Sequence, residues 1–416
     1  MTVSSEHVHQ LTGVEDVQGF VTRVCFKTGP PGTVGIESEW FVVDPANRHR
    51  HVPIPELERA LHGTSLPRGS LVTYEPGGQL ELSSAPAPNI SAVRRNLEID
   101  LEAARALLDS AGLLLLGCGS DPHRPPKIQA IGPRYTAMHQ FFAHRGSAGE
   151  AMMGSTAAIQ ICLDAGRDEA HVRRRWRVAN ALLPILLAAF ANSPLRLGRP
   201  TGFRSSRYAV WAAIDPGRTT VPEGPDPAEA WARYALAARV MVVRTPDGAW
   251  LADPGFTFEE WVRGDTPLTR PTEDDLAYHL TTLFPPVRPR SWFELRYLDA
   301  LPDGIWQVAA GVTTALIEDD VAADAATDVA QSVAGLTPVA MRDAVGDPRL
   351  RRAALRCLEL AAEALPRLTA AVMVPEVERF REHYTERGRC PADDLLEPNR
   401  EPFEASTPHG RHPLWP

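Results

Sequence analysis

The sequence predicts an α+β protein built on a mainly antiparallel sheet. Segments with the alternating pattern of β-strands dominate about the first 165 residues, and no helices separate them at regular β-α-β intervals. After Asp303 the chain is rich in alanine and keeps a helical spacing of apolar residues to about Arg387. We therefore expect a sheet-based region over residues 1–302. A helical region over residues 303–416 should pack on the same domain.

The expected strands lie mostly in the N-terminal part of the chain. They cover residues 35–44, 70–76, 79–84, 113–119, 155–164 and 291–299. The second and third strands flank the turn Pro76-Gly77-Gly78, which is typical of a hairpin. Such a hairpin would bring Glu75, the residue before the turn, back beside Glu81.

One long amphipathic helix stands out between these strands. Apolar residues recur at helical spacing from Ile90 to Ser110, and Asn89 is suited to be the N-cap. Further helices are expected at about 168–190, 227–238 and 273–283, and helix breaks at Pro338, Pro348 and Pro366. Residues 196–226 are rich in Gly, Pro, Arg and Ser and lack periodicity. They are expected to form a long functional loop, a candidate lid.

Composition disfavours several classes of protein. The 416 residues are 44% hydrophobic and 23% charged, so the chain can build a sizeable core and is not disordered. A net charge of −9 argues against a surface that coats nucleic acid. The five cysteines are widely spaced without a C-x-x-C motif, so neither a disulfide framework nor a cysteine zinc site is indicated. Without a leader-like N-terminus or a 20-residue apolar run, we expect a soluble, cytoplasmic protein with no membrane partner.

Acidic and amide side chains recur at every second position of the apolar strands. Residues i and i+2 of a strand point to the same face, so these groups should share one face of each strand. The pairs or sets are Glu37 with Glu39, Gln79 with Glu81, Glu294 with Arg296, and Thr156 with Ala158 and Gln160. One explanation is that each forms the solvated face of a half-exposed antiparallel sheet.

The alternative explanation is a metal site. If the strands pair in one sheet, five carboxylates converge, and they could not remain ionised together without cations between them. A ligand set of oxygen atoms without His or Cys favours Mg²⁺ or Mn²⁺ over zinc. No G-x-x-x-x-G-K-[ST] loop is present, which excludes a P-loop enzyme. The residues therefore predict a metal-dependent phosphoryl-transfer site on an antiparallel sheet.

A series of motifs resembles a known family. In chain order they are GIESEW, TYEPGGQLELSS, PRYTAM, MMGSTAAIQICLD, NSPLRLGRPTGFRSSRYAVW, DPGRT, HLTTLFPPVR and FELRYLD. Together, from about Gly35 to Asp299, they resemble the plant-type glutamate–cysteine ligases. They are most similar to the bacterial branch that makes γ-glutamylcysteine for ergothioneine biosynthesis. The resemblance implies a glutamine synthetase-like catalytic fold over residues 1–302, in which a curved, mainly antiparallel sheet forms a funnel flanked by helices.

The same resemblance implies roles for individual residues. The implied metal ligands are Glu37, Glu39, Glu75, Glu81, Gln160 and Glu294. Arg296 corresponds to an arginine that contacts phosphate, and with Glu294 it is the implied catalytic pair. Arg207 corresponds to an arginine that holds the glutamate α-carboxylate. The other implied substrate-binding residues are Arg134, Tyr135, Thr156 and Arg218.

The activity that the resemblance implies is ATP-dependent ligation of L-glutamate to L-cysteine through a γ-glutamyl phosphate, with Mg²⁺ or Mn²⁺ as cofactor. Three alternatives stay open at the level of sequence. The glutamate and ATP motifs also fit a ligase that uses another amine acceptor. The carboxylate set alone also fits a two-metal phosphohydrolase. The third alternative is a catalytically silent metal-binding scaffold.

Overall fold

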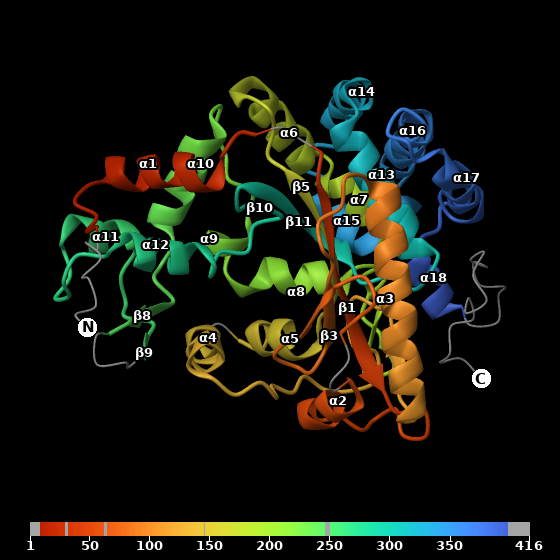
Figure 1. Cartoon of the computed structure of the whole chain (residues 1–416), viewed down its shortest axis with the longest axis horizontal. Helices are drawn as coiled ribbons and strands as arrows, with labels where there is room; N and C mark the ends of the chain where they lie inside the picture. Colours follow the sequence, from red (N-terminus) through yellow and green to blue (C-terminus); the bar gives the residue numbers. More distant parts are fainter. Residues whose placement is uncertain (1–8, 30–31, 62–64, 145, 246–249, 398–416) are drawn as a thin grey trace.

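The computed structural model describes residues 9–29, 32–61, 65–144, 146–245 and 250–397 (Figure 1). Its centre is a seven-stranded sheet in the order β10-β11-β5-β1-β3-β2, with β4 paired to the far end of β1. All of its strand pairs are antiparallel. The strands are β1 Val34–Val43, β2 Leu71–Tyr74, β3 Leu80–Ser83, β4 Leu114–Leu116, β5 Ala158–Asp164, β10 Val287–Pro289 and β11 Trp292–Asp299. The prediction of an α+β fold on an antiparallel sheet is confirmed.

The register of the sheet brings the polar positions of three strands together. In the middle of the sheet, Glu39 of β1 pairs with Glu81 of β3, and on the other side Glu37 pairs with Gln160 of β5. Strand β11 follows β5, so Glu294 lies two strands away from β1 and pairs with Cys162. The β11–β5 register shifts between Leu295 and Leu298, an irregularity that includes Arg296. Such bulges re-aim side chains and are frequent beside active sites.

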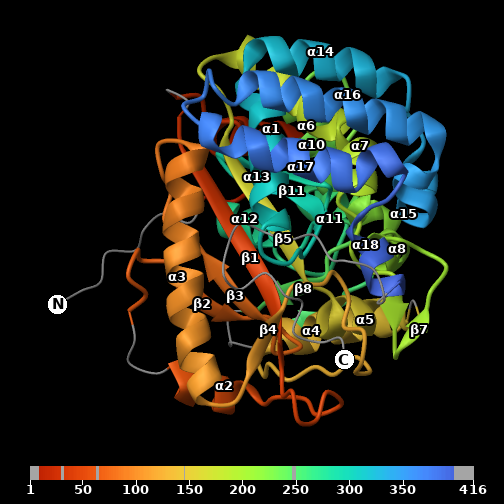
Figure 2. The same ribbon diagram turned by 90° about the vertical axis from the view of Figure 1, so that its right-hand side faces the viewer.

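The apolar face of the sheet packs against long helices. Ile36, Trp40 and Leu82 are buried on this face, and the Arg105 guanidinium of α3 lies 5.2 Å from the Trp40 ring centroid. Helix α3 (Ile90–Ser110) runs alongside β1, as Figure 2 shows. The Asn89 side chain accepts a hydrogen bond from the Ala92 N–H (2.9 Å), which confirms the predicted N-cap. Helix α13 (Ile305–Glu318) is buried along nearly its whole length.

The C-terminal helices share one hydrophobic core with the sheet. They are α14 Asp320–Gln331, α15 Thr337–Asp343, α16 Pro348–Ala364, α17 Val374–His383 and α18 Pro391–Leu396. The predicted breaks are confirmed: Pro338 lies in the first turn of α15, Pro348 begins α16, and α16 ends before Pro366. The exact division at residue 302 remains a prediction.

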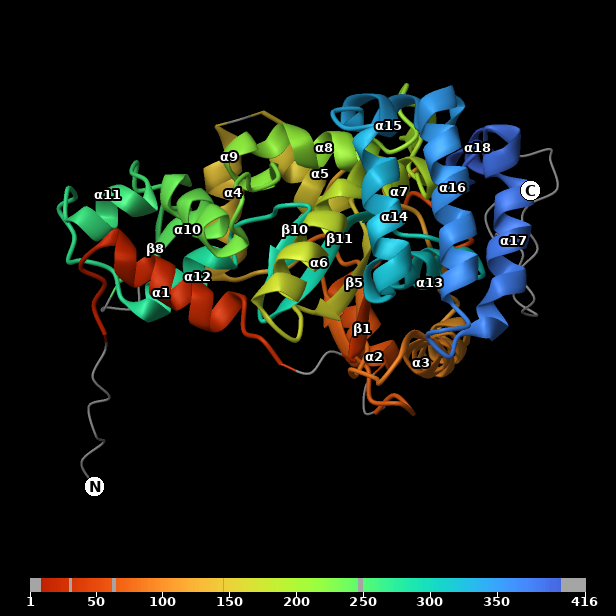
Figure 3. The ribbon, with the colours of Figure 1, turned by 90° about the horizontal axis from the view of Figure 1, so that it is seen from above.

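Three helices lie on the side of the sheet opposite α3 (Figure 1 and Figure 3). They are α4 Pro133–Ala143, α5 Ala148–Ser155 and α8 Ser206–Ile214. Away from the sheet, a second group of elements comprises α1 Val14–Cys25, α10 Pro227–Ala237, α11 Phe258–Arg263, α12 Glu273–Leu280, β8 Val242–Arg244 and β9 Trp250–Ala252. Helices α6 (Glu169–Ala181) and α7 (Leu183–Ala189) divide the single helix expected at 168–190, beside Pro184.

The prediction of a long loop at 196–226 is wrong. This segment contains most of the hairpin of β6 (Leu195–Arg196) and β7 (Arg199–Pro200), then helices α8 and α9 (Pro216–Thr219). The backbone N–H groups of Arg204 and Ser205 both donate to the Met341 carbonyl, at 3.0 and 2.9 Å, so this segment is anchored to α15. The expectation that it forms a lid rested on its being a long loop and therefore has no support. Helix α8 lacks a clear apolar period because its Arg207, Tyr208 and Trp211 side chains line a pocket and do not form an apolar stripe.

Other short helices were also missed by the sequence patterns, including α2 (Ile54–Leu61), α4 and α5. Helix α5 extends to Ser155, so the strand predicted from 155 begins only at Ala158. All five cysteines lie in the described ranges and are free thiols. Within those ranges no helix is long and apolar enough to cross a bilayer.

Candidate active site

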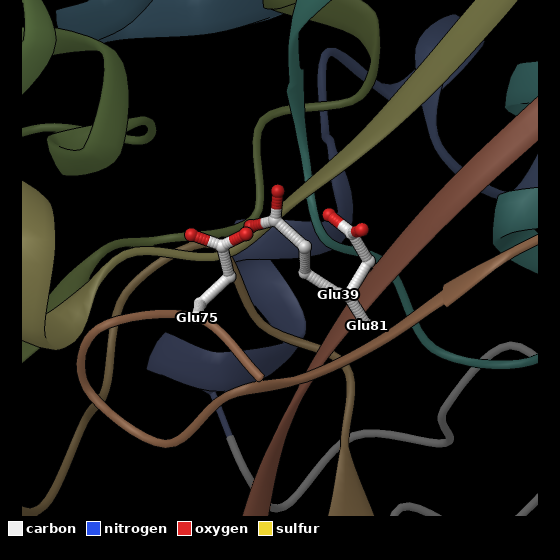
Figure 4. Close-up of side chains that lie close together, drawn as sticks. All are labelled: Glu39, Glu75 and Glu81. Atoms are coloured by element: carbon white, nitrogen blue, oxygen red, sulfur yellow. The ribbon is translucent and has the colours of Figure 1, made fainter. Parts of the chain in front are cut away.

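Three carboxylates meet on the polar face of the sheet. Glu39 comes from β1, Glu81 from β3, and Glu75 from the turn between β2 and β3 (Figure 4). One carboxylate oxygen of each lies within 4.8 Å of the others. Glu75 is brought there by the predicted hairpin, in which its N–H donates to the Gln79 carbonyl at 2.9 Å.

The turn itself requires glycine at both of its Gly positions. Gly78 has φ +88°, a conformation that L side chains rarely adopt. A Cβ on Gly77 would lie 2.4 Å from the Gly154 carbonyl oxygen, so the close approach of the turn to α5 excludes a side chain. The Pro-Gly-Gly sequence therefore fixes the position of Glu75 relative to Glu81.

Burial and mutual repulsion make the ionised form of these carboxylates unfavourable. Burial, and then the neighbouring Glu75 and Glu81, raise the pKa of Glu39 to about 8. Burial and the charge of Glu81 raise the pKa of Glu75 to about 7. The group therefore favours either a bound proton or a cation among its oxygens.

Glu37 lies on the same face of β1, two residues before Glu39. Burial, and then the charges of Glu294 and Glu81, raise its pKa to about 7. Its carboxylate is not one of the three that meet within 4.8 Å. Its predicted role as a metal ligand remains a prediction.

Glu294 is instead surrounded by arginines. The side chain is fully buried; Arg288 Nη2 lies 2.7 Å from its Oε1, and Arg296 also donates to Oε1. Arg290 Nη1 lies 3.6 Å from Oε2. Burial alone would raise the pKa of Glu294, but the Arg288 and Arg296 charges lower it to about 2.

Of the five predicted carboxylates, Glu39, Glu75 and Glu81 form the group whose oxygens lie within 4.8 Å of one another. Strand β5 separates β11 from β1, which places Glu294 roughly 10 Å from the Glu39 strand at the usual strand spacing. Glu294 holds arginine side chains in this structure, and its role as a metal ligand stays a prediction.

Gln160 connects the acidic group with the arginines. Its Nε2 donates to Glu39 Oε1 at 3.0 Å, and its Oε1 accepts a hydrogen bond from Arg296. The second Glu39 oxygen accepts the Ala158 N–H at 2.8 Å. Gln160 therefore orients both a carboxylate and a guanidinium, and its amide has protein partners on both sides.

A cationic pocket lies beside this network. Arg207 of α8 donates from Nη2 to the Arg296 carbonyl at 2.8 Å, and both guanidinium carbons lie 5.7 Å from the Trp211 ring centroid. The pocket has about 310 Å³ of empty volume, part of it open solvent. Its lining includes Arg207, Trp211, Phe284, Pro286, Arg296 and Tyr297. Arg207 Nε and Trp211 Nε1 are buried and have no hydrogen-bond partner within the described structure, so two donors beside the pocket are left unsatisfied.

Arg134 and Tyr135 begin helix α4 on the far side of the acidic group. Burial raises the pKa of Glu75, and the charge of Arg134 offsets a small part of that rise. The pKa of Tyr135 is raised mainly by burial, with a smaller contribution from the charge of Glu75. Arg134 also donates to Thr281, at 3.0 Å to Oγ1 and 3.1 Å to the carbonyl. Their predicted substrate-binding roles remain predictions.

Two other predicted substrate-binding residues have their polar groups engaged by the protein. Arg218 is fully buried: it donates to Asp215, to Thr282 and to the Arg239 carbonyl, and its guanidinium lies 4.4 Å from the Phe141 ring centroid. The Thr156 hydroxyl donates to the Met152 carbonyl at 2.6 Å. These contacts favour structural roles over the substrate contacts expected from the sequence.

The sequence matches the family "Glutamate-cysteine ligase family 2 (GCS2)" over residues 33–409. The chain belongs to this family. Glutamate–cysteine ligase EgtA of Mycobacterium tuberculosis strain H37Rv is 42% identical over 396 residues, covering 93% of this chain and 90% of the relative. EgtA of Mycolicibacterium smegmatis is 40% identical over 93% of this chain and 92% of its own length. The chloroplastic glutamate–cysteine ligase of Brassica juncea is 34% identical over 64% of this chain and 52% of its length.

Solved structures show the same fold at much lower sequence identity. A glutamate–cysteine ligase of Francisella tularensis in complex with AMP has a TM-score of 0.56 at 14% identity, covering 90% of this chain and 86% of that one. A bifunctional glutathione synthetase of Pasteurella multocida has a TM-score of 0.51 at 14% identity, over 96% of this chain and 52% of that one. The family resemblance of the sequence motifs is confirmed.

Two residues of this family member were missed by the sequence reasoning. Arg288 pairs with Glu294 across the β10–β11 hairpin, and Trp211 lies against both arginines of the pocket. Arg288 could have been found: the motif HLTTLFPPVR ends six residues before Glu294, and a hairpin there would place the two side by side. Trp211 carried no such signal, because a tryptophan in a helix is most often a core residue.

Proposed function

We propose that the chain joins the γ-carboxylate of L-glutamate to the amine of L-cysteine, with hydrolysis of ATP to ADP and phosphate. The observation that carries this proposal is the arrangement of Glu39, Glu75 and Glu81 beside Arg296 and Arg207 on one face of the sheet. Membership in the glutamate–cysteine ligase family and 42% identity to EgtA support the choice of substrates. We place the product in ergothioneine biosynthesis and the enzyme in the cytoplasm.

The acidic group fits a hard divalent cation. Its donors are carboxylate oxygens alone, from three residues whose mutual repulsion a cation would relieve. We propose that Glu39, Glu75 and Glu81 hold Mg²⁺, or Mn²⁺ in its place, and that Glu37 and Glu294 belong to the same metal-binding face. When bound, the ion supplies positive charge that offsets the phosphate charge of ATP.

The cationic pocket fits the amino acid. Arg207 lines the pocket with a planar guanidinium, a group suited to paired hydrogen bonds with a carboxylate, and Trp211 lies on the same wall. We assign the glutamate α-carboxylate to Arg207. Arg296, between this pocket and Glu294, would then contact the phosphoryl group in transfer.

The chemistry follows from these positions in two steps. A γ-carboxylate oxygen of glutamate attacks the γ-phosphorus of ATP, and ADP leaves. The neutral cysteine amine then attacks the acyl carbon and the C–O bond to phosphate breaks. The amide forms, phosphate leaves with the former carboxylate oxygen, and the proton lost by the nitrogen balances as hydrogen phosphate. Removing one contact that stabilises developing charge typically costs about 3 kcal/mol, or two decades in rate.

The experiment that tests this function measures ADP release with ATP, Mg²⁺ and glutamate fixed and the amine varied. We expect ADP release to depend on cysteine and to match γ-glutamylcysteine formation one to one. ADP and phosphate released at the full rate without any amine would indicate a phosphohydrolase. Preference for another amine would keep the ligase mechanism and replace the second substrate.

A further inference from the structure

A buried carboxylate at the end of β11 organises the start of helix α8. Asp299 is 1% exposed. One of its oxygens, Oδ2, accepts hydrogen bonds from the Asn192 N–H (2.8 Å) and the Ser193 hydroxyl (2.7 Å). The other, Oδ1, accepts from the Ser205 hydroxyl (2.9 Å) and lies 4.0 Å from Arg207 Nη1. Asp299 ends the motif FELRYLD, and Asn192, Ser193 and Ser205 lie in NSPLRLGRPTGFRSSRYAVW; none of these four had an assigned role.

The Ser193 and Ser205 hydroxyls connect the Asp299 carboxylate to the backbone of α8 by hydrogen bonds. The Ser193 hydroxyl accepts the Arg207 N–H at 3.0 Å. The Ser205 hydroxyl accepts the Tyr208 N–H at 3.2 Å and is the N-cap of α8. Because each hydroxyl has only one proton and gives it to Asp299, its lone pairs are directed at the first turn of the helix. The carboxylate therefore fixes the orientation of both caps.

The surroundings leave the Asp299 side chain little freedom. A Cβ on Gly119 would lie 2.5 Å from Asp299 Cγ, so only glycine leaves room for the carboxylate. The Asn192 side chain donates to the carbonyls of Gly117 (3.0 Å) and Ala300 (2.8 Å), which ties the segments on either side. The packing around Gly119 and the hydrogen bonds from Asn192, Ser193 and Ser205 therefore fix the position of the Asp299 carboxylate.

We propose that Asp299 is a positioning residue for the substrate carboxylate: through Ser193 and Ser205 it sets where Arg207 enters the pocket. The inference rests on the proposed function, in which Arg207 binds glutamate. Three residues earlier on the same strand, Arg296 lines the same pocket and accepts the Arg207 Nη2–H at its carbonyl. Strand β11 therefore fixes both arginines, one directly and the other through Asp299. A small displacement of such a group is enough to lose much of its binding.

The test compares steady-state kinetics of Asp299→Asn and Ser205→Ala with the unaltered enzyme. In Asp299→Asn the side chain keeps its size, but its NH₂ group faces a serine hydroxyl that now donates to the carboxylate. In Ser205→Ala the hydroxyl that links Asp299 to the Tyr208 N–H is lost. We expect the glutamate KM to rise about tenfold in each variant, with the ATP KM within about twofold. Unchanged glutamate KM, or parallel rises in both KM values, would overturn the proposal. If Asp299→Asn does not fold, Ser205→Ala and Ser193→Ala decide by the same criterion.

Two further variants separate this inference from other causes. Asp319→Asn is the matched control, because Asp319 also caps a helix, accepting from the Ala322 N–H, and pairs with an arginine, but lies in the α13–α14 connection. It should lower the melting temperature without moving the glutamate KM. In an Arg207→Lys background, Asp299→Asn should raise the glutamate KM by less than about threefold, since both changes act on one contact. If the rise in the glutamate KM of the double variant equalled the product of the rises in the two single variants, the proposal would be overturned. No effect of Arg207→Lys alone would overturn the proposed function of Arg207 and this inference with it.

Discussion

Glu39 and Glu81 stand directly opposite each other across the β1–β3 ladder, and their carboxylate oxygens come within 4.8 Å. Like charges at directly opposed positions destabilise a sheet. Glu75 adds a third carboxylate from the adjoining turn. The protein therefore keeps a repulsive arrangement at the centre of its sheet, and the first two predictions follow from it.

We expect Glu81→Gln to stabilise the metal-free protein and to abolish its response to Mg²⁺. The amide removes one of the repelling charges while its oxygen can still accept from Thr73 and Ser83, which now bond Glu81 at 2.8 and 3.0 Å. The gain should be about 1 kcal/mol in urea unfolding without metal, and activity should fall at least about a hundredfold. Glu102→Gln, at an exposed position of α3, is the control and should change neither. A normal Mg²⁺-dependent rise in stability in Glu81→Gln would remove this residue from the metal site.

The stability of the metal-free protein should fall as the pH rises from about 5 to 8. The pKa values of Glu37 and Glu75 are raised to about 7 and that of Glu39 to about 8, all above the ordinary value of 4.5. At these three carboxyls the folded state binds more protons than the unfolded state in this range, so their contribution to the free energy of unfolding decreases with increasing pH. Melting temperatures with EDTA should show this slope, and saturating Mg²⁺ should flatten it. A flat profile with EDTA would contradict the raised pKa values.

Arg207→Lys should raise the glutamate KM strongly and leave the ATP KM within a few-fold. An ammonium group cannot reproduce the paired hydrogen bonds of a planar guanidinium to a carboxylate. Arg196→Lys, at an exposed position of β6, is the matched control and should leave both constants unchanged. If the ATP constant moved and the glutamate constant did not, Arg207 would belong to the nucleotide site.

Arg218→Leu should destabilise the protein without a specific effect on glutamate. The buried guanidinium bonds Asp215 at 3.1 Å and the Thr282 carbonyl at 3.0 Å, and its loss leaves these groups without that partner. We expect about 3 kcal/mol less stability in urea unfolding. At a temperature where the variant is folded, its glutamate KM should stay within about threefold. A large and selective rise of that constant would restore the substrate contact expected from the sequence.

Glutamate labelled with ¹⁸O in its γ-carboxylate should deliver one labelled oxygen to phosphate for each dipeptide formed. In an acyl-phosphate mechanism that oxygen leaves with the phosphate when cysteine attacks, whereas a hydrolase would take it from water. Mass spectrometry of the released phosphate measures the transfer. Unlabelled phosphate together with accumulating γ-glutamylcysteine would exclude the acyl-phosphate intermediate.

Features that depend on a short stretch of chain were predictable from the sequence. Alternation along β1 placed Glu37 and Glu39 on one face, the Pro-Gly-Gly turn brought Glu75 to Glu81, and Asn89 marked the start of α3. The order of the motifs along the chain was sufficient to indicate the family. The strand face, the turn and the N-cap each depend on backbone geometry within about ten positions, which the sequence alone determines.

The order of the strands and the partners of buried charges were decided only by the tertiary structure. Because β5 lies between β1 and β11, Gln160 bonds both Glu39 and Arg296. Asp299 became visible as the anchor of α8 only when segments about a hundred residues apart came together. Alternation says which face of a strand a side chain occupies, but not which strand lies beside it. That neighbour is set by the packing of the whole sheet, and it decides whether a carboxylate is paired with an arginine or left to face other carboxylates.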